Sequence, residues 1–203
     1  MLTISVQAGG QSRRMGRDKA LMPFLGRPLI LRVIERVRPA AAELFLVAND
    51  VDKFHFTGLA VFPDRIPGLG VLGGLLTALH TASHPFVALV ACDMPFASAA
   101  LLAHQAALIE HSGADVVIPQ SAHGLEPLHA VYRRETCLPL VEEAVHLGLR
   151  RMDSWFERAA LRVLTAEETR PFDPAEGAFA NLNTPEDLAW AEALALKSQS
   201  SEG

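Results

Sequence analysis

Hydrophobic residues follow two patterns that alternate along most of the chain: short apolar runs and longer segments with helical spacing. Phe86 to Ala91 is an unbroken apolar run, typical of a central parallel strand that is covered on both faces. Between Pro28 and Pro39, apolar residues recur at i, i+3, i+4 and i+7, which predicts an amphipathic helix. The same patterns predict strands at Leu2 to Val6, Leu44 to Val47, Leu59 to Phe62, Ala114 to Pro119, Leu128 to Tyr132 and Leu161 to Leu164, an extended segment at Ala178 to Leu182, and helices after Gly74, at 98 to 111, Thr136 to Leu147, Asp153 to Ala159 and after Thr184.

Strands that alternate with helices predict βαβ units, and therefore an α/β fold with a three-layer, doubly wound, mostly parallel sheet. We expect one domain over residues 1–197 and a flexible tail over 198–203. One strand fits less well, because Thr3 and Ser5 give Leu2 to Val6 the alternation of a half-exposed strand. We expect these two hydroxyls to be hydrogen-bonded inside the protein.

Composition narrows the possible functions. The chain has 203 residues, 50% of them hydrophobic, and a formal net charge of -5, which argues against broad nucleic-acid binding. Cys92 and Cys137 are too few for a disulfide framework or a zinc site, and the first eight residues lack the pattern of a signal peptide. No apolar run reaches membrane-spanning length. We therefore expect a cytoplasmic protein with a small-molecule ligand.

The stretch from Gln7 to Lys19 reads QAGGQSRRMGRDK and directly follows the first predicted strand. Gly9 and Gly10 allow an anion to approach the backbone N–H groups closely, and Arg14 and Lys19 add cationic side chains. The spacing matches neither the Walker A pattern nor the dinucleotide-binding fingerprint. The stretch therefore predicts a phosphate-binding loop of another kind.

Three more polar residues stand at the ends of predicted strands: Asn49, Asp64 and Asp93. Ligands of open parallel sheets bind at the carboxyl ends of the strands, so these residues and the glycine loop are expected to face one site. Asp93 follows the most apolar strand and offers a carboxylate on a rigid support. Because Mg²⁺ takes one or two protein carboxylates and completes its shell with phosphate and water, Asp93 is a candidate magnesium ligand.

The loop sequence AGGQSRRMG followed by Asp18 and Lys19, together with Cys92 to Pro95 (CDMP), resembles the nucleoside-triphosphate transferases of the sugar-nucleotide and cofactor type. Within that group the chain is most similar to the molybdenum cofactor guanylyltransferases, because Glu126 to Tyr132 and Phe179 to Leu188 also match them. The resemblance covers nearly the whole chain. It departs from the family at Gln7, where Leu is usual, and at Val71, where the glycine-rich turn usually has Pro.

The resemblance implies a Rossmann-like nucleotidyltransferase fold and assigns roles to particular residues. Lys19, Asp93 and Arg14 are implied to be catalytic, with Asp93 holding Mg²⁺. The implied acceptor-binding residues are Asn181 and Asn183, and the implied nucleotide-binding residues are Gln7, Ala8, Gly9, Gly10, Ser12, Lys19, Asn49, Asp64 and Asp93.

Six of these residues also have a purely structural interpretation. Asp93 could cap the helix that starts near Ser98, and Lys19 could be a solvated surface lysine. Asn49 and Asp64 could be turn residues, and Asn181 and Asn183 could cap the last helix. His129, in the motif EPLHAVY, is expected to be packed rather than catalytic.

The implied reaction is transfer of GMP from GTP to the terminal phosphate of molybdenum-bound molybdopterin, with release of pyrophosphate. Other molybdenum cofactor biosynthesis proteins or recipient enzymes are candidate partners. Two alternatives stay open: a related nucleotidyltransferase, cytidylyl or other, with a different phosphorylated acceptor, and a non-catalytic nucleotide-binding module. A sugar-phosphate transferase with an appended acyltransferase is disfavoured because the sequence has no hexapeptide repeats.

Overall fold

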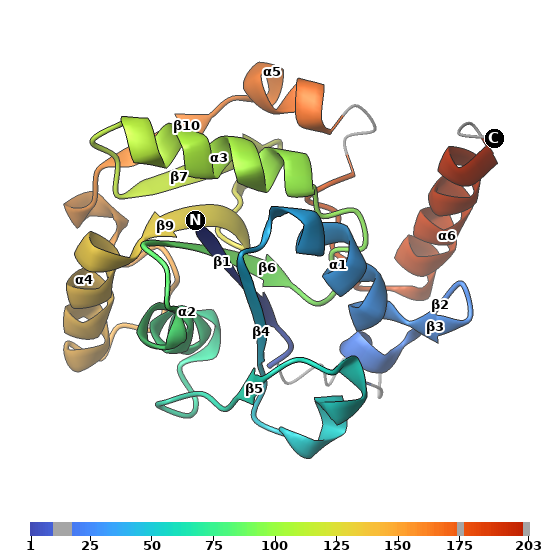
Figure 1. Ribbon diagram of the computed structural model, residues 1–203, viewed down its shortest axis with the longest axis horizontal. Helices are drawn as coiled ribbons and strands as arrows, with labels where there is room; N and C mark the ends of the chain where they lie inside the picture. Colours follow the sequence, from blue (N-terminus) through green and yellow to red (C-terminus); the bar gives the residue numbers. More distant parts are fainter. Residues whose placement is uncertain (10–17, 174–176, 201–203) are drawn as a thin grey trace.

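The protein is built on one large twisted sheet, as Figure 1 shows for the computed structural model, which describes residues 1–9, 18–173 and 177–200. Its strand order is β10-β7-β9-β6-β1-β4-β5, with β8 paired to β7. The neighbouring strands of this sheet are parallel, with two exceptions. Strand β9 is antiparallel to β6 and β7, and strand β8 is antiparallel to β7. The strands are β1 (Leu2–Gln7), β4 (Glu43–Val47), β5 (Val61–Phe62), β6 (Phe86–Ala91), β7 (Val116–Ser121), β8 (Gly124–Leu125), β9 (His129–Arg133) and β10 (Leu161–Leu164). The predicted doubly wound, mostly parallel sheet is confirmed.

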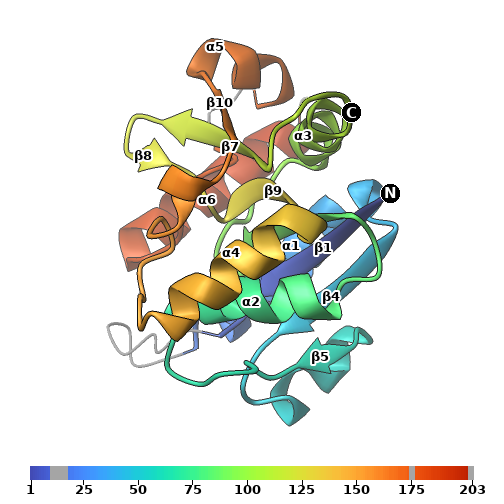
Figure 2. The same cartoon turned by 90° about the vertical axis from the view of Figure 1, so that its left-hand side faces the viewer.

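Helices cover both faces of this sheet and complete the three layers (Figures 1 and 2). Helices α1 (Leu29–Val37) and α3 (Ala99–His111) share one buried cluster with Ile4, Val6 and Val90. Helices α2 (Gly70–Thr81) and α4 (Arg134–His146) pack on the other face against residues such as Leu89 and Tyr132. The side chains of β6 are buried on both faces, as its unbroken apolar run predicts.

A smaller cluster lies beside the main sheet. Helix α6 (Pro185–Ser200) packs Ala191 and Ala195 against Phe24 and Leu29, where strands β2 (Pro23–Phe24) and β3 (Arg27–Pro28) form a hairpin. Figure 1 shows α6 next to this hairpin, on the side of the molecule where α1 lies. The remaining helical elements are α5 (Ala166–Thr169) and the 3₁₀ helices η1 (Lys19–Leu21), η2 (Arg38–Ala40), η3 (Asp52–Thr57), η4 (Phe156–Arg158) and η5 (Arg170–Phe172).

The polar residues of β1 are buried, although their alternation is that of a half-exposed strand. The Thr3 hydroxyl donates a hydrogen bond to Glu43 Oε2 over 2.6 Å, and Ser5 Oγ accepts one from Gln7 Nε2 over 2.8 Å. Both residues have no exposed surface. Because their hydroxyls are satisfied, a polar–apolar alternation is compatible with a central strand, and the expected internal hydrogen bonds are confirmed.

The glycine-rich segment from Gly68 to Gly74 is mostly helical, since α2 begins at Gly70. At Gly74 a Cβ atom would lie 2.1 Å from Gln7 Oε1, so a side chain there would require the end of the Gln7 side chain to move. Gly68 and Gly70 have positive φ angles of 84° and 59°, a conformation that favours glycine. Gly74 therefore leaves room for the Gln7 side chain at the end of the strand that precedes the predicted phosphate-binding loop.

Three predicted elements differ in the structure. The helix predicted at Asp153 to Ala159 is a turn followed by η4, and Trp155 and Phe156 pack there against the sheet. The segment 178–182 joins no strand ladder among the described residues and runs past Asp93 as an irregular chain. Helix α6 continues through Ser200, so 198–200 are helical where the sequence predicts a tail. No helix in the described ranges is long and apolar enough to cross a membrane.

Candidate active site

The predicted site residues follow strands that end at the same edge of the sheet. Strands β1, β4, β5 and β6 are parallel, and the register pairs Gln7 with both Val47 and Ala91 at their ends. The chain that follows these strands carries the glycine loop, Asn49, Asp64 and Asp93, respectively. The topology thus brings the four predicted polar positions to one edge.

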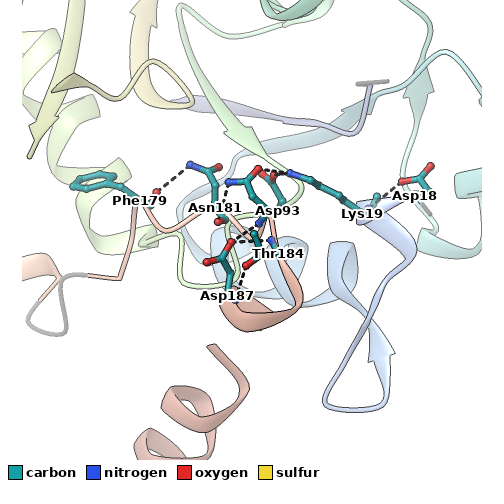
Figure 3. A network of polar contacts seen from close by, with 9 residues as sticks. Asp18, Lys19, Asp93, Phe179, Asn181, Thr184 and Asp187 are labelled. Atoms are coloured by element: carbon teal, nitrogen blue, oxygen red, sulfur yellow. Dashed lines mark hydrogen bonds and ion pairs between the residues drawn. The ribbon is translucent and has the colours of Figure 1, made fainter. Parts of the chain in front are cut away.

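Lys19 links Asp93, after β6, to Asn183, in the segment before α6. Its ammonium donates to Asp93 Oδ2 over 3.0 Å and to Asn183 Oδ1 over 2.6 Å, and Figure 3 shows the Lys19 side chain pointing toward Asp93. The side chains of Lys19 and Asp93 are 16% and 15% exposed. Lys19 is therefore not a solvated surface lysine. The Asp93 and Asn183 oxygens, which lie far apart in the sequence, both contact its ammonium.

Backbone contacts fix the position of Asp93. Cys92 N donates to Gln7 O over 3.1 Å, and Leu182 N donates to Asp93 O over 3.0 Å. The nearby helix α3 is capped by its own Ser98, whose Oγ accepts from Leu101 N. The interpretation of Asp93 as that helix's cap is therefore wrong, and its carboxylate is available to the site.

The segment with Asn181 and Asn183 is held by the first turn of α6. Asp187 Oδ2 accepts from the backbone N–H groups of Asn183 and Thr184, both over 2.8 Å, and Asp187 N donates to Thr184 Oγ1. These hydrogen bonds, the one from Asn183 N first, lower the pKa of the Asp187 carboxyl. Thr184 and not an asparagine side chain is the cap, as the Thr-Pro-Glu-Asp pattern predicts.

The asparagine side chains are consequently free for other contacts. Asn183 Nδ2 donates to Asn181 O, and Asn181 Nδ2 donates to Phe179 O over 3.1 Å. Figure 3 shows this chain of contacts running from Phe179 toward Asp93. The capping interpretation of both asparagines is therefore wrong, and the structure brings Asn183 into direct contact with Lys19.

A small pocket of about 150 Å³ joins the start of the glycine loop to the Lys19–Asp93 pair. Its lining includes Gln7, Ala8 and Gly9 on one side and Asp18, Lys19, Cys92, Asp93 and Leu128 around it. Among the described residues, a Cβ atom on Gly9 would come no closer than 3.8 Å to its neighbours, so this part of the fold would tolerate a side chain there. The predicted residues Gly10, Ser12 and Arg14 lie outside the described part of the chain.

Asn49 and Asp64 form a second polar group at the same edge. Asn49 Nδ2 donates to Asp64 Oδ2 over 2.9 Å, and Asp64 N donates to Asn49 Oδ1 over 3.0 Å. This reciprocal pair links the chain segments after β4 and β5, and both residues are exposed or partly exposed. The two positions are brought together, but they do not contact the Lys19–Asp93 pair through any hydrogen bond among the described residues.

The oxygen donors beside Lys19 suit Mg²⁺ better than a transition metal. Asp93 Oδ2 and Asn183 Oδ1 are hard oxygen donors that already surround a positive charge, the Lys19 ammonium. No group of three or more His, Cys, Asp or Glu side chains gathers as a metal cluster within the described ranges. A cation bound here would complete its coordination with phosphate and water, as Mg²⁺ commonly does.

The thiol and the histidine near the site are held neutral. Burial raises the pKa of the Cys92 thiol, helped by Asp93. Cys137 lies on α4 and contacts Asp115, just before β7, and burial raises the pKa of its thiol to about 12. Burial lowers the pKa of His129 to about 4, and its Nε2 accepts from Ser98 N over 3.0 Å. His129 is fully buried, so the prediction that it is packed is confirmed. A thiolate nucleophile is not favoured at this site.

Sequence reasoning missed two contributions to the site. Lys53 forms an ion pair with Asp18, and no motif predicts it. The sequence pattern after Thr184 makes Asp187 an acidic residue in the first turn of a helix, and the structure shows that its carboxylate also fixes Asn183. Its spacing of three residues from Thr184 was the signal for this cap.

The fold and this edge define the chain as an α/β nucleotidyltransferase. A family model described as "MobA-like NTP transferase domain" matches residues 4–163, and the chain belongs to the MobA-like NTP transferase family. A probable molybdenum cofactor guanylyltransferase from Carboxydothermus hydrogenoformans is 34% identical over 92% of each chain. A molybdenum cofactor guanylyltransferase from Desulfosudis oleivorans is 33% identical over 93% of each.

Solved structures show the same relationship. The molybdopterin-guanine dinucleotide biosynthesis protein A from Archaeoglobus fulgidus superposes with a TM-score of 0.84 at 29% identity, covering 96% of this chain and 99% of that one. A 4-diphosphocytidyl-2C-methyl-D-erythritol synthase from Anaerococcus prevotii has a TM-score of 0.73 at 13% identity. The second likeness shows the fold alone, and the predicted family is confirmed by the family model and the two relatives above.

Proposed function

We propose that this chain transfers GMP from GTP to the terminal phosphate of molybdenum-bound molybdopterin, forming the guanine dinucleotide cofactor and pyrophosphate. The observation that carries the proposal is the convergence of Asp93 Oδ2 and Asn183 Oδ1 on Lys19 Nζ, beside the backbone of Gly9. Membership in a family with guanylyltransferases over nearly the full chain supports the substrate. The chain is expected to act in the cytoplasm.

In the proposed reaction, an acceptor phosphate oxygen attacks the α-phosphorus of GTP. A new P–O bond forms while the bond to the bridging α,β-oxygen breaks, and that oxygen leaves with pyrophosphate. The attacking group is already an anion, so the protein needs no strong general base. Its work is to align two polyanions and to neutralise their charge.

Each charged group has a distinct part in this work. Lys19 moves from Asp93 to phosphate oxygens and balances the charge of the leaving pyrophosphate. Asp93, with Asn183 beside it, would hold Mg²⁺, which supplies positive charge to the triphosphate when bound. The N–H groups of the loop that starts at Gly9 hold phosphate oxygens. Gly10, Ser12 and Arg14 are proposed to continue this loop.

The two substrates would enter from opposite sides of β6. Asn49 and Asp64 lie after β4 and β5 on one side, where their amide and carboxylate can bind a base edge or ribose hydroxyls. Asn181 and Asn183, in the segment before α6, are proposed to bind the acceptor; their contacts with Phe179 and Asp187 hold that segment. Lys19 and Asp93 lie between these two groups, where the phosphates of both substrates would meet.

The test is to incubate the purified protein with molybdopterin, Mg²⁺ and α-labelled GTP, CTP or ATP, and to identify the labelled product. The proposal expects a labelled dinucleotide from GTP and at least about 10-fold less from CTP or ATP, a preference that one or two lost hydrogen bonds can produce. Preferential use of CTP would replace the guanylyl assignment with a cytidylyl one. Absence of any labelled product with Mg²⁺ and molybdopterin present would favour a nucleotide-binding module.

A further inference from the structure

Lys53 lies behind the candidate active site, in η3, which follows β4 and the Asn49 turn. Its ammonium forms an ion pair with Asp18 Oδ2, and the two side chains are 31% and 30% exposed. Asp18 and the next residue, Lys19, both line the pocket, whereas Lys53 is outside the lining formed by the described residues. Lys53 therefore contacts the site through Asp18.

Asp18 uses its two carboxylate oxygens for different purposes. Oδ1 accepts from Ala20 N over 3.0 Å and caps η1, the short helix that begins with Lys19. Oδ2 is held by Lys53. The Asp18 backbone carbonyl also accepts from Leu21 N over 3.1 Å. One side chain thus sets the first turn of η1 and ties that turn to the segment after β4.

The direction of Lys19 depends on this turn. η1 has only three residues, and a helix this short has little stability of its own. Lys19 carries a long side chain with several rotatable bonds, yet its Nζ must reach Asp93 Oδ2 and Asn183 Oδ1 from that turn. A shift of the turn by about 1 Å is enough to misalign a catalytic group.

We infer that Lys53 is a positioning residue for nucleotidyl transfer: its ion pair with Asp18 holds the turn from which Lys19 reaches the reacting phosphates. The expected effect of Lys53 on turnover rests on the proposed function. The expected effect of Lys53 on the position of Lys19 rests on geometry alone. As a partly exposed ion pair, Lys53–Asp18 contributes little to overall stability. Its effect is therefore expected on the site and not on folding.

A double-mutant cycle separates action through Asp18 from direct contact with substrate. Lys53→Met and Asp18→Asn are each expected to lower kcat about 10-fold with less than about a 3-fold change in the KM for GTP, because alignment and not ground-state binding is lost. The double variant should lose no more than the stronger single variant. Lys53→Arg should recover most of the activity. Multiplying losses in the double variant, or a raised KM for GTP, would show that Lys53 contacts the nucleotide and would overturn the inference.

A second readout does not require activity. Lys19, Lys53 and Lys197 are the three lysines of the chain, so ε-¹³C-lysine labelling gives three assignable NMR signals. Lys53→Met should shift the Lys19 signal in the ligand-free protein, and the matched control Lys197→Met should leave it unchanged. An unshifted Lys19 signal in Lys53→Met would overturn the inference. Failure of wild-type protein to form the dinucleotide would instead count against the proposed function.

Discussion

The sheet is built differently on the two sides of β6. On the side of β1, β4 and β5 the strands are parallel, and the polar residues after them reach one edge by topology alone. On the other side β9 is antiparallel, so it begins at this edge and contributes the buried His129 to the site's support. There, the exposed polar residues come from the irregular segment before α6. The side proposed to bind the nucleotide thus depends on regular βα units, and the side proposed to bind the acceptor depends on specific side-chain contacts.

The largest expected effect is at Asp93, which both sides share. Asp93→Ala should lower turnover by at least about 10³-fold with Mg²⁺, because both the metal ligand and its contribution to charge balance are lost. Pyrophosphate release measures turnover, and circular dichroism should show an unchanged fold. Asp52→Ala, at an exposed residue of η3, is the control. Near-normal activity of Asp93→Ala would contradict the metal assignment.

The antiparallel side should be sensitive to acid. The pKa of His129 is about 4 in the folded protein and about 6.5 in an unfolded chain. Between these values the unfolded chain binds a proton that the folded protein excludes. The free energy of unfolding should therefore fall as the pH drops from about 6.5 to 4, by about 3 kcal/mol from this group, and be fully retained above about pH 7.

Denaturant titrations of wild type and His129→Gln at several pH values measure this effect, because Gln can accept a hydrogen bond but does not titrate. The variant should lose part of the acid sensitivity. Seven other histidines also titrate, so the difference between the two proteins is the relevant quantity. Identical pH dependences would show that His129 is not the group responsible.

Between the two sides, Lys19→Ala should lower kcat about 10²-fold or more, the loss typical of a single stabilising donor. The ligand-free variant should also bind Mn²⁺ more tightly than wild type, because the ammonium no longer competes for Asp93 Oδ2 and Asn183 Oδ1. Isothermal titration calorimetry measures this binding, with Lys197→Ala as the control. A loss of activity below a few-fold would assign Lys19 no catalytic part.

The smallest effect is expected on the acceptor side at Asp187. Asp187→Ala removes the acceptor for two backbone N–H groups and frees the segment that carries Asn183, so kcat/KM for the acceptor should fall about 10-fold. Binding of GTP should be unchanged. Glu186→Ala, at the adjacent residue in the same turn, is the matched control. Equal losses for both substrates would show that Asp187 does not act on the acceptor side alone.

The regular half of the fold could be predicted from the sequence because its signals are local. The apolar run of β6 and the helical spacing of α1 each describe one element, and the rule for parallel strands then places Asp93, Asn49 and Asp64 at one edge. The structure confirms this arrangement.

The irregular half depends on contacts that no local pattern describes. The path of 178–182 past Asp93 is fixed by the hydrogen bond from Leu182 N to Asp93 O. The Lys53–Asp18 and Lys19–Asn183 contacts join residues 35 and 164 positions apart. The aromatic pair Trp155 and Phe156 packs into the core from a turn, although the composition there predicts a helix.

The most direct test of the site is a crystal structure with Mn²⁺ and a GTP analogue that carries a methylene group between the α- and β-phosphorus atoms. We predict that the anomalous signal places Mn²⁺ on the Asp93 carboxylate and that the triphosphate lies against the backbone at Gly9. Lys19 Nζ should contact phosphate oxygens instead of Asp93. A nucleotide and Mn²⁺ bound elsewhere, with the Lys19–Asp93 ion pair intact, would contradict this prediction.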